Sequence, residues 1–183
     1  MECARPPILS HQAISRVVLR YFPFKEIDTS SIEEFVSYDD RNYFFRGEPL
    51  DDTLQNEYVL KVTNFNDPPE VVNGISGITK HLHEKGYKCP YPIPLARPGS
   101  EYVDMVVMSY KQLVVFEKEE TKNGDLAEEN GAVNKYCVRV LVFVSGKLLS
   151  SVPQTPALLF KVGRYVGSLD KDLQVLKVEN NDW

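Results

Sequence analysis

The stretch that decides the fold is EYVLKVTN, residues 57–64. Its apolar residues Tyr58, Leu60 and Val62 recur at every second position, which is the spacing of a β-strand with one buried face. Lys61 falls between them and projects from the opposite face. Because burying an ammonium group is costly unless it has a partner, Lys61 either lies in solvent on a half-exposed sheet or faces a functional cleft.

Other strand-like and helix-like segments surround this stretch. Runs rich in β-branched and aromatic residues predict strands, and apolar stripes with capping residues predict helices. We expect strands at 31–37, 42–47, 57–64, 102–119 (with a turn near 109–112) and 135–147, and helices at 10–22, 68–86 and 155–174. The polar segment 121–134 contains two Asn-Gly pairs and is expected to be a hairpin loop. The order of these elements indicates an α+β fold with a mainly antiparallel sheet.

Two of the predicted helices carry clear signals at their ends. Ser10 fits the N-cap of the first helix, and Thr155 followed by Pro156 fits the start of the last one. The last helix also carries an apolar stripe that we expect to face the core. The stripe consists of Leu158, Leu159, Val162, Val166 and Leu169.

Composition excludes several classes of protein. The 183 residues carry a net charge of −5 and a pI near 5.3, which argues against a general nucleic-acid or anionic-membrane binder. No apolar run is long enough to span a membrane, and the N-terminal residues lack the apolar region of a secretory signal. Cys3, Cys89 and Cys137 lie far apart and form no CxxC, which argues against a disulfide framework or a zinc site and favours the cytoplasm.

Three short patterns carry residues that could do chemistry. Asp39 and Asp40 lie in YDDRN (38–42), where paired carboxylates either bind a cation or simply shape a turn. Glu70 lies in the first turn of a predicted helix, a position that the helix dipole favours for any carboxylate. A strand lysine followed by a helix glutamate is also the arrangement with which kinases hold nucleotide phosphates. The P-loop pattern GxxxxGK[ST] and the hydrolase pattern GxSxG are absent from the sequence.

Taken in order, these segments resemble the N-terminal lobe of the aminoglycoside phosphotransferase (kinase-like) family. The similarity extends from about residue 31 to residue 174 and is nearest to the members that phosphorylate 5-hydroxy-L-lysine with GTP. It is carried by SYDDRNYFF (37–45), EYVLKVTN (57–64), EVVN (70–73), HLHEKGY (81–87), YCVRVLVFVSGK (136–147) and LLFKVGRYVGSLDKDLQ (158–174).

The resemblance implies a fold and a division of the chain. It implies a kinase-like N-lobe with a mainly antiparallel sheet, a helix packed on that sheet, and the first helix after the hinge. An N-terminal helical segment is then expected at 1–30, the N-lobe at 31–147, and the hinge exit with the first helix of a truncated C-lobe at 148–183.

The resemblance also implies a nucleotide site. Lys61 would contact the phosphates and Glu70 would orient Lys61, although a register set from the end of the helix puts Asn73 in the place of the glutamate. The turn that covers the nucleotide and the hinge at 142–146, whose backbone meets the purine edge, supply the remaining contacts. These residues are Ser37, Asp39, Asp40, Asn42, Val142 and Val144.

Family members use GTP or ATP with Mg2+ and a small amino-alcohol substrate. The catalytic loop HGDLxxxN and the metal-binding DFGD of the family are absent from these 183 residues. We therefore predict no catalytic residue and no metal ligand here, and weak nucleotide binding or none. The alternatives are a non-catalytic kinase-like remnant, which would associate with a partner through its exposed lobe interface or have no function, and an unrelated α+β binding domain.

Overall fold

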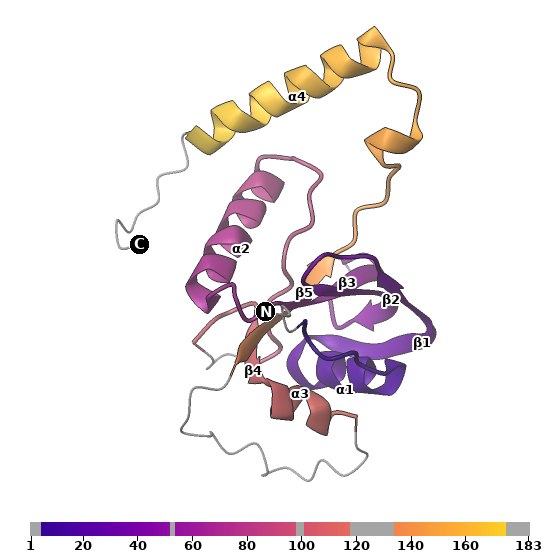
Figure 1. Ribbon diagram of the computed structural model, residues 1–183, viewed down its shortest axis with the longest axis vertical. Coiled ribbons are helices and arrows are strands. Elements are labelled where there is room, and N and C mark those ends of the chain that lie inside the picture. Colours follow the sequence, from indigo (N-terminus) through magenta and orange to yellow (C-terminus); the bar gives the residue numbers. More distant parts are fainter. Residues whose placement is uncertain (1–4, 52–53, 98–100, 118–133, 175–183) are drawn as a thin grey trace.

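A five-stranded antiparallel sheet organises the chain (Figure 1). The computed structural model describes residues 5–51, 54–97, 101–117 and 134–174. The sheet order is β1-β2-β3-β5-β4, which confirms the predicted α+β class and suits a kinase-like N-lobe. The strands are β1 (Phe24–Phe35), β2 (Arg41–Pro49), β3 (Glu57–Thr63), β4 (Val106–Ser109) and β5 (Lys135–Val142), and the helices are α1 (His11–Tyr21), α2 (Pro69–Glu84), α3 (Tyr110–Val115), the short 3-10 helix η1 (Leu149–Ser151) and α4 (Pro156–Gln174).

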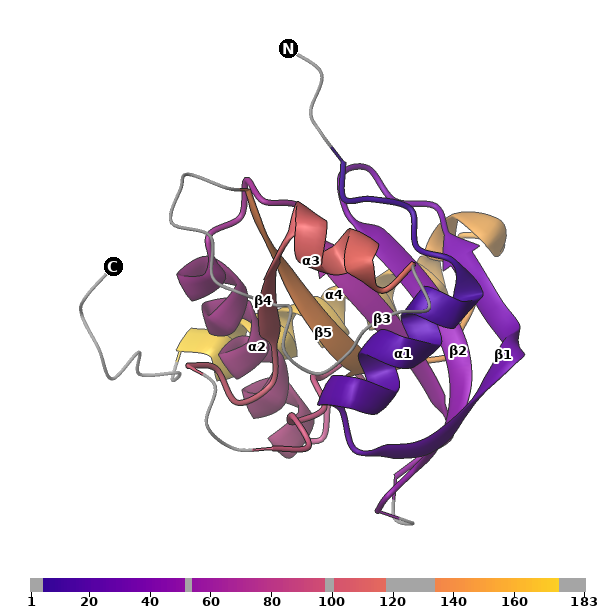
Figure 2. The same cartoon turned by 90° about the horizontal axis from the view of Figure 1, so that it is seen from below.

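The main core lies between the sheet and α1. Tyr58, Leu60 and Val62 of the central strand β3 have no exposed surface, as their alternation predicts. From α1, Ile14 and Val17 pack into the same cluster. Figure 2 shows α1 and α3 over this face of the sheet, with α2 and α4 beyond its other face. The face that carries Lys61 is therefore the one turned toward α2 and α4.

Two predicted elements need correction, and a third is not tested. β1 begins at Phe24 rather than at residue 31, because it continues its pairing with β2 through two register irregularities. Residues 110–115 form helix α3 rather than strand, because Ser109 and Gln112 make a capping box at its start. The hairpin loop expected at 121–134 falls almost wholly outside the described residues.

Helix α4 has the predicted start but not the predicted burial. The Leu158 N–H donates to Thr155 Oγ1 at 3.2 Å, which confirms the N-cap. The core-facing stripe is wrong, since no residue of α4 is buried and Val166 is 55% exposed. The reason is visible in Figure 1, where α4 lies beyond α2 and away from the sheet. None of the helices in the described parts of the chain combines the length and apolar character that a membrane span requires.

Candidate functional site

The sheet face that is turned toward α2 and α4 is called the open face. It carries a row of three polar side chains at its centre. Lys61 on β3 pairs with Asn42 on β2 and with Arg139 on β5. Residues directly opposite one another in antiparallel strands point to the same face. The structure thus brings two of the sequence-predicted site residues, Asn42 and Lys61, together on one face, and adds a second cation that the sequence analysis did not single out.

The partner of Lys61 is Asp40. The Lys61 ammonium forms an ion pair with Asp40 Oδ2, and the two side chains are 24% and 17% exposed. The Asp40 Oδ1 atom accepts a hydrogen bond from the Asn64 N–H at 2.9 Å. Both oxygens of this carboxylate are therefore engaged at the end of β3.

Glu70 and Asn73 take no part in this ion pair. Both residues are exposed on α2, and among the described residues the ion pair recorded for Lys61 is the one with Asp40. Glu70 lies in the first turn of the helix, where the dipole favours a carboxylate. The pairing of Lys61 with a helix residue stays a prediction.

The turn that supplies Asp40 is held by the segment before α1. Arg5 donates to the Ser37 carbonyl at 3.1 Å, and Arg41 Nε donates to the Pro6 carbonyl at 2.8 Å. Asp39, in the same turn, is exposed. The turn is thus tied at both ends, while Asp39 is turned outward.

Arg139 anchors α2 to the sheet. It is 4% exposed and donates through Nη1 to Ser76 Oγ at 3.1 Å and, over a longer distance, to the Val72 carbonyl at 3.4 Å. Burial lowers the pKa of the guanidinium, while the nearby Asp104 carboxylate acts in the opposite direction. The Asp104 carboxylate in turn forms an ion pair with Lys80 of α2 at 2.6 Å. Arg139 therefore fixes α2 on the open face of the sheet, and Lys80 ties the helix to the segment before β4.

An aromatic cluster lies on the same face as Lys61. Phe44 is two residues from Asn42 on β2, and its ring centroid lies 5.0 Å from that of Phe143 and 5.9 Å from that of Phe35. All three rings are partly exposed. The sequence analysis missed this cluster, although the alternation of NYFF already assigns Phe44 to the face of Asn42.

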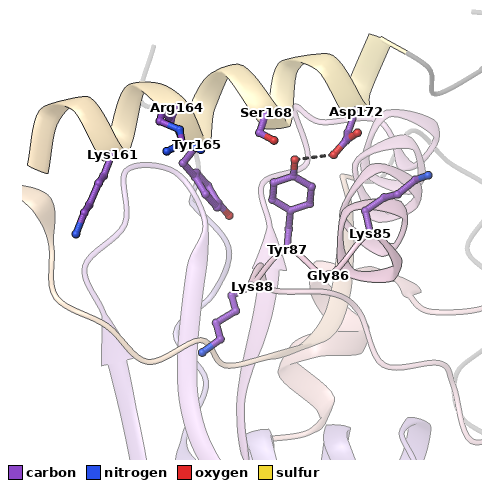
Figure 3. Close-up of a pocket in the computed structure, with 9 residues that line it drawn as sticks. All are labelled: Lys85, Gly86, Tyr87, Lys88, Lys161, Arg164, Tyr165, Ser168 and Asp172. Atoms are coloured by element: carbon purple, nitrogen blue, oxygen red, sulfur yellow. Dashed lines mark hydrogen bonds between the residues drawn. The ribbon is translucent and has the colours of Figure 1, made fainter.

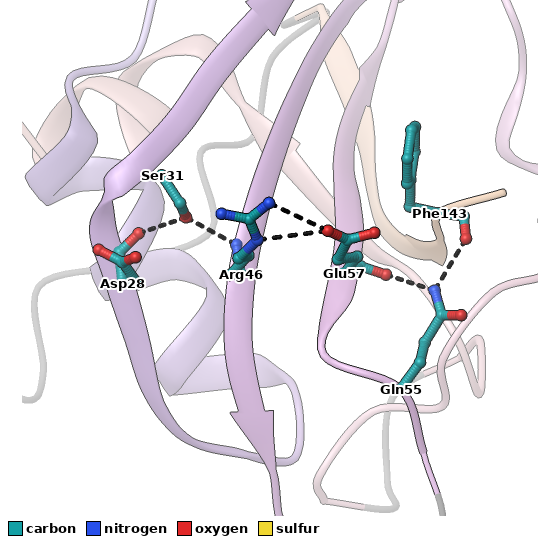
Figure 4. A network of polar contacts seen from close by, with 6 residues as sticks. All are labelled: Asp28, Ser31, Arg46, Gln55, Glu57 and Phe143. Carbon is teal, nitrogen blue, oxygen red and sulfur yellow. Dashed lines mark hydrogen bonds and ion pairs between the residues drawn. The ribbon is translucent and has the colours of Figure 1, made fainter. Parts of the chain in front are cut away.

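The linker after β5 is held to the start of β3 (Figure 4). The Phe143 N–H donates to the Glu57 carbonyl at 3.0 Å. Gln55 Nε2 donates to the Phe143 carbonyl at 2.8 Å, and Arg46 pairs with the Glu57 carboxylate at 3.2 Å. Both backbone polar groups of Phe143 are therefore used within the chain.

Of the two predicted linker contacts, Val144 fits better than Val142. The Val142 N–H donates to the Tyr91 carbonyl at 3.0 Å. Within the part of the chain that the structure describes, no hydrogen bond is recorded for the backbone of Val144, which is 36% exposed. The contact of either residue with a ligand stays a prediction.

A separate groove of about 640 Å3 lies between α4 and the residues after α2 (Figure 3). Gly86 adopts a φ of 86°, which favours glycine, and turns the chain along the groove. The Tyr87 hydroxyl donates to Asp172 Oδ2 at 2.6 Å, which joins this segment to α4. The carboxylate raises the pKa of Tyr87. The cations around the groove are Lys85, Lys88, Lys161 and Arg164.

Comparison with curated proteins finds similarity to hydroxylysine kinases. The chain is 25% identical to a hydroxylysine kinase of Xenopus laevis over 176 residues, which is 92% of this chain and 39% of that protein. It is 24% identical to a hydroxylysine kinase of Mus musculus over 94% of this chain and 41% of that protein. The chain is thus similar, at low identity, to part of these hydroxylysine kinases.

The relationship to hydroxylysine kinases covers only part of those proteins. A third relative, the hydroxylysine kinase of Bos taurus, is 25% identical over 92% of this chain and 39% of its own length. The chain thus spans about two-fifths of the length of the curated relatives it matches. No protein-family model matches the chain. No solved structure matches it significantly.

Proposed function

We propose that this chain forms the nucleotide-binding lobe of a phosphotransferase that uses GTP with Mg2+. One observation carries the proposal: a partly exposed lysine, Lys61, lies on the same open sheet face as the aromatic cluster of Phe35, Phe44 and Phe143. A lysine is a common point-charge ligand for phosphates, and aromatic faces bind nucleobases. The similarity to hydroxylysine kinases over most of the chain supports the same assignment.

The roles of the residues follow from this arrangement. Lys61 contacts the phosphates, and Ser37, Asp39 and Asn42 lie over them from the turn and the start of β2. The Val144 backbone meets the purine edge at the linker. The acceptor that the relatives' names indicate is hydroxylysine, and we propose the hydroxyl of 5-hydroxy-L-lysine as the group that receives the phosphoryl group in the whole protein.

Magnesium is proposed as part of the nucleotide rather than as a resident ion of this chain. Among the described residues, no group of three or more side chains is placed to hold a metal. Both Asp40 oxygens are already engaged. Phosphoryl transfer depends on metal charge neutralisation and a positioned base, and the family motifs for both are absent from these 183 residues. We therefore expect nucleotide binding rather than turnover from this polypeptide by itself.

Calorimetry with the purified chain tests the proposal. GTP and ATP are titrated in the presence and absence of Mg2+ into the wild type, Lys61→Met and the control Lys88→Met, which removes an exposed lysine from the separate groove. Methionine keeps the apolar stem of lysine without its charge. We expect weak, Mg2+-dependent binding with GTP preferred, a loss of about tenfold or more in Lys61→Met, and no change in Lys88→Met. Equal binding by the wild type and Lys61→Met would remove the role of Lys61.

A second candidate function, a non-catalytic binding module, is favoured by the exposed apolar surface of α4. Leu159 is 49% exposed, Phe160 68% and Val166 55%. Large apolar side chains exposed on one helix offer a surface for interaction with a partner. The double variant Phe160→Ser/Val166→Ser, compared with the wild type by light scattering at increasing concentration, tests it. Association of the wild type that the variant abolishes, without nucleotide binding by either, would favour the module over the kinase lobe.

We also propose that the protein works in the cytoplasm. Cys89 and Cys137 are free thiols in the structure, and free thiols persist in reducing compartments. Fractionation of cells that express a tagged full-length protein tests this placement.

A further inference from the structure

Asp40 is engaged within the chain through both oxygens of its carboxylate. Its Oδ2 forms the ion pair with Lys61, and its Oδ1 accepts the Asn64 N–H at 2.9 Å. One carboxylate thereby joins the turn before β2 to the last residues of β3. A carboxylate with both oxygens engaged inside the chain is poorly suited to bind a ligand itself, and well suited to hold a neighbouring cation in one orientation.

The turn behind Asp40 is fixed independently of Lys61. The next residue, Arg41, donates to the Pro6 carbonyl at 2.8 Å and forms an ion pair with Glu34 at 2.5 Å. The side chain of Lys61 has four rotatable bonds, and its ammonium loses much conformational freedom when it is held. Because the Asp40 carboxylate is itself fixed, its ion pair restricts the conformational freedom of the Lys61 side chain before any ligand binds.

The helix glutamate is not needed to hold α2 or Lys61 in place. Arg139 and Lys80 connect α2 to the sheet and to Asp104, and Glu70 is exposed at the start of the helix. In the kinase arrangement, one lysine–glutamate pair both orients the lysine and fixes the helix. Here the two tasks are divided between separate contacts.

We propose that Asp40 is the positioning residue of Lys61 and takes the orienting role that the sequence assigns to Glu70. The inference rests on the proposed function, in which Lys61 binds the nucleotide phosphates. Asp40 acts on the ligand through Lys61 alone, so its effect is confined to the phosphate-dependent part of binding.

The test compares Asp40→Asn by calorimetry with three variants at other positions and with Asp40→Glu. Asparagine removes the charge but keeps an oxygen that can accept the Asn64 N–H, so the turn is preserved. Asp67→Asn is the matched control, since it makes the same chemical change at an exposed site just after β3. Glu70→Gln probes the competing role, and Lys61→Met removes the cation. Each variant is titrated with GTP and with guanosine, both in the presence of Mg2+, and its fold is checked by circular dichroism.

We expect Asp40→Asn to weaken GTP binding by about tenfold without changing guanosine binding. Asp67→Asn should match the wild type, and Glu70→Gln should lose less than Asp40→Asn. Asp40→Glu, which restores a carboxylate, should recover part of the lost GTP affinity and serves as the second variant if Asp40→Asn is unstable.

Three results would overturn the proposal. Unchanged or tighter GTP binding by Asp40→Asn, with binding lost in Lys61→Met, would show that Asp40 does not orient Lys61 or competes with the ligand for it. Equal loss of GTP and guanosine, with no recovery in Asp40→Glu, would make Asp40 a purely structural residue. Wild-type GTP binding by Lys61→Met would instead refute the proposed function, and the positioning role would fall with it.

Discussion

Replacing Arg139 by methionine should loosen α2 from the sheet. Arg139 is 4% exposed, and its bond to Ser76 Oγ at 3.1 Å has ordinary geometry, whereas the bond to the Val72 carbonyl at 3.4 Å is long and contributes little. A hydrogen bond from a charged group contributes about 1.5–3 kcal/mol. The variant also leaves the Ser76 hydroxyl without its donor. We therefore expect the free energy of unfolding to fall by about 2 kcal/mol.

A competing argument predicts the opposite sign. Burying a charge is costly, so an apolar replacement of similar volume is often neutral or stabilising, and the Nε of Arg139 is buried without a hydrogen-bond partner among the described residues. What decides between the two arguments is Asp104. This carboxylate is 1% exposed and interacts with the charge of Arg139. Removing Arg139 leaves the buried Asp104 carboxylate with Lys80 as its remaining cation, and the lost attraction to Arg139 opposes the gain.

Urea denaturation followed by circular dichroism measures the loss, and hydrogen exchange locates it. Ser76→Ala alone should cost about 1 kcal/mol, and the double variant should cost no more than Arg139→Met, because both changes remove the same bond. Amides of α2 should exchange faster in Arg139→Met than in the wild type, while those of β3 should not. A variant as stable as the wild type, or more stable, would refute the reasoning and leave the position of α2 to its apolar contacts and to the Lys80–Asp104 ion pair.

Three further outcomes are expected. Tyr43→Phe should lower the free energy of unfolding by about 1 kcal/mol in urea titrations, because the Leu9 N–H donates to the Tyr43 hydroxyl at 3.1 Å in a buried position; an unchanged midpoint would contradict this. Burial raises the pKa of the Cys137 thiol from 9.0 to about 11, so the unfolded state releases a proton that the folded state keeps, and stability should fall as the pH rises from 9 toward 11; Cys137→Ala should lose that part of the pH dependence, and a parallel profile would argue against it. Phe160→Ser should leave the thermal midpoint unchanged, because Phe160 is 68% exposed, whereas a large drop would place it against a packed surface.

Local sequence patterns predicted most of the fold because each depends on near neighbours. The alternation in residues 57–64 identified the buried face of β3, and the capping residues Ser10 and Thr155 located two helix starts. The same reasoning failed for 110–115, where a capping box overrides a run of strand-forming residues. The prediction also failed for the apolar stripe of α4. An apolar helix face indicates that the face is suited to burial, but it does not show which surface of the same chain would cover it.

The sequence by itself determined which residues share a face, and with them that Lys61 projects away from the core. Only the tertiary structure decided what Lys61 meets there. Its partner Asp40 and its neighbours in the row, Asn42 and Arg139, are distant in sequence and come together through strand register and one turn. Side-chain alternation excludes a slip by one residue, which would turn every side chain to the other face, but it does not say which residues of neighbouring strands lie opposite one another. Both Asp40 and Glu70 are candidates from the sequence. Only the folded sheet shows that the carboxylate paired with Lys61 is that of Asp40.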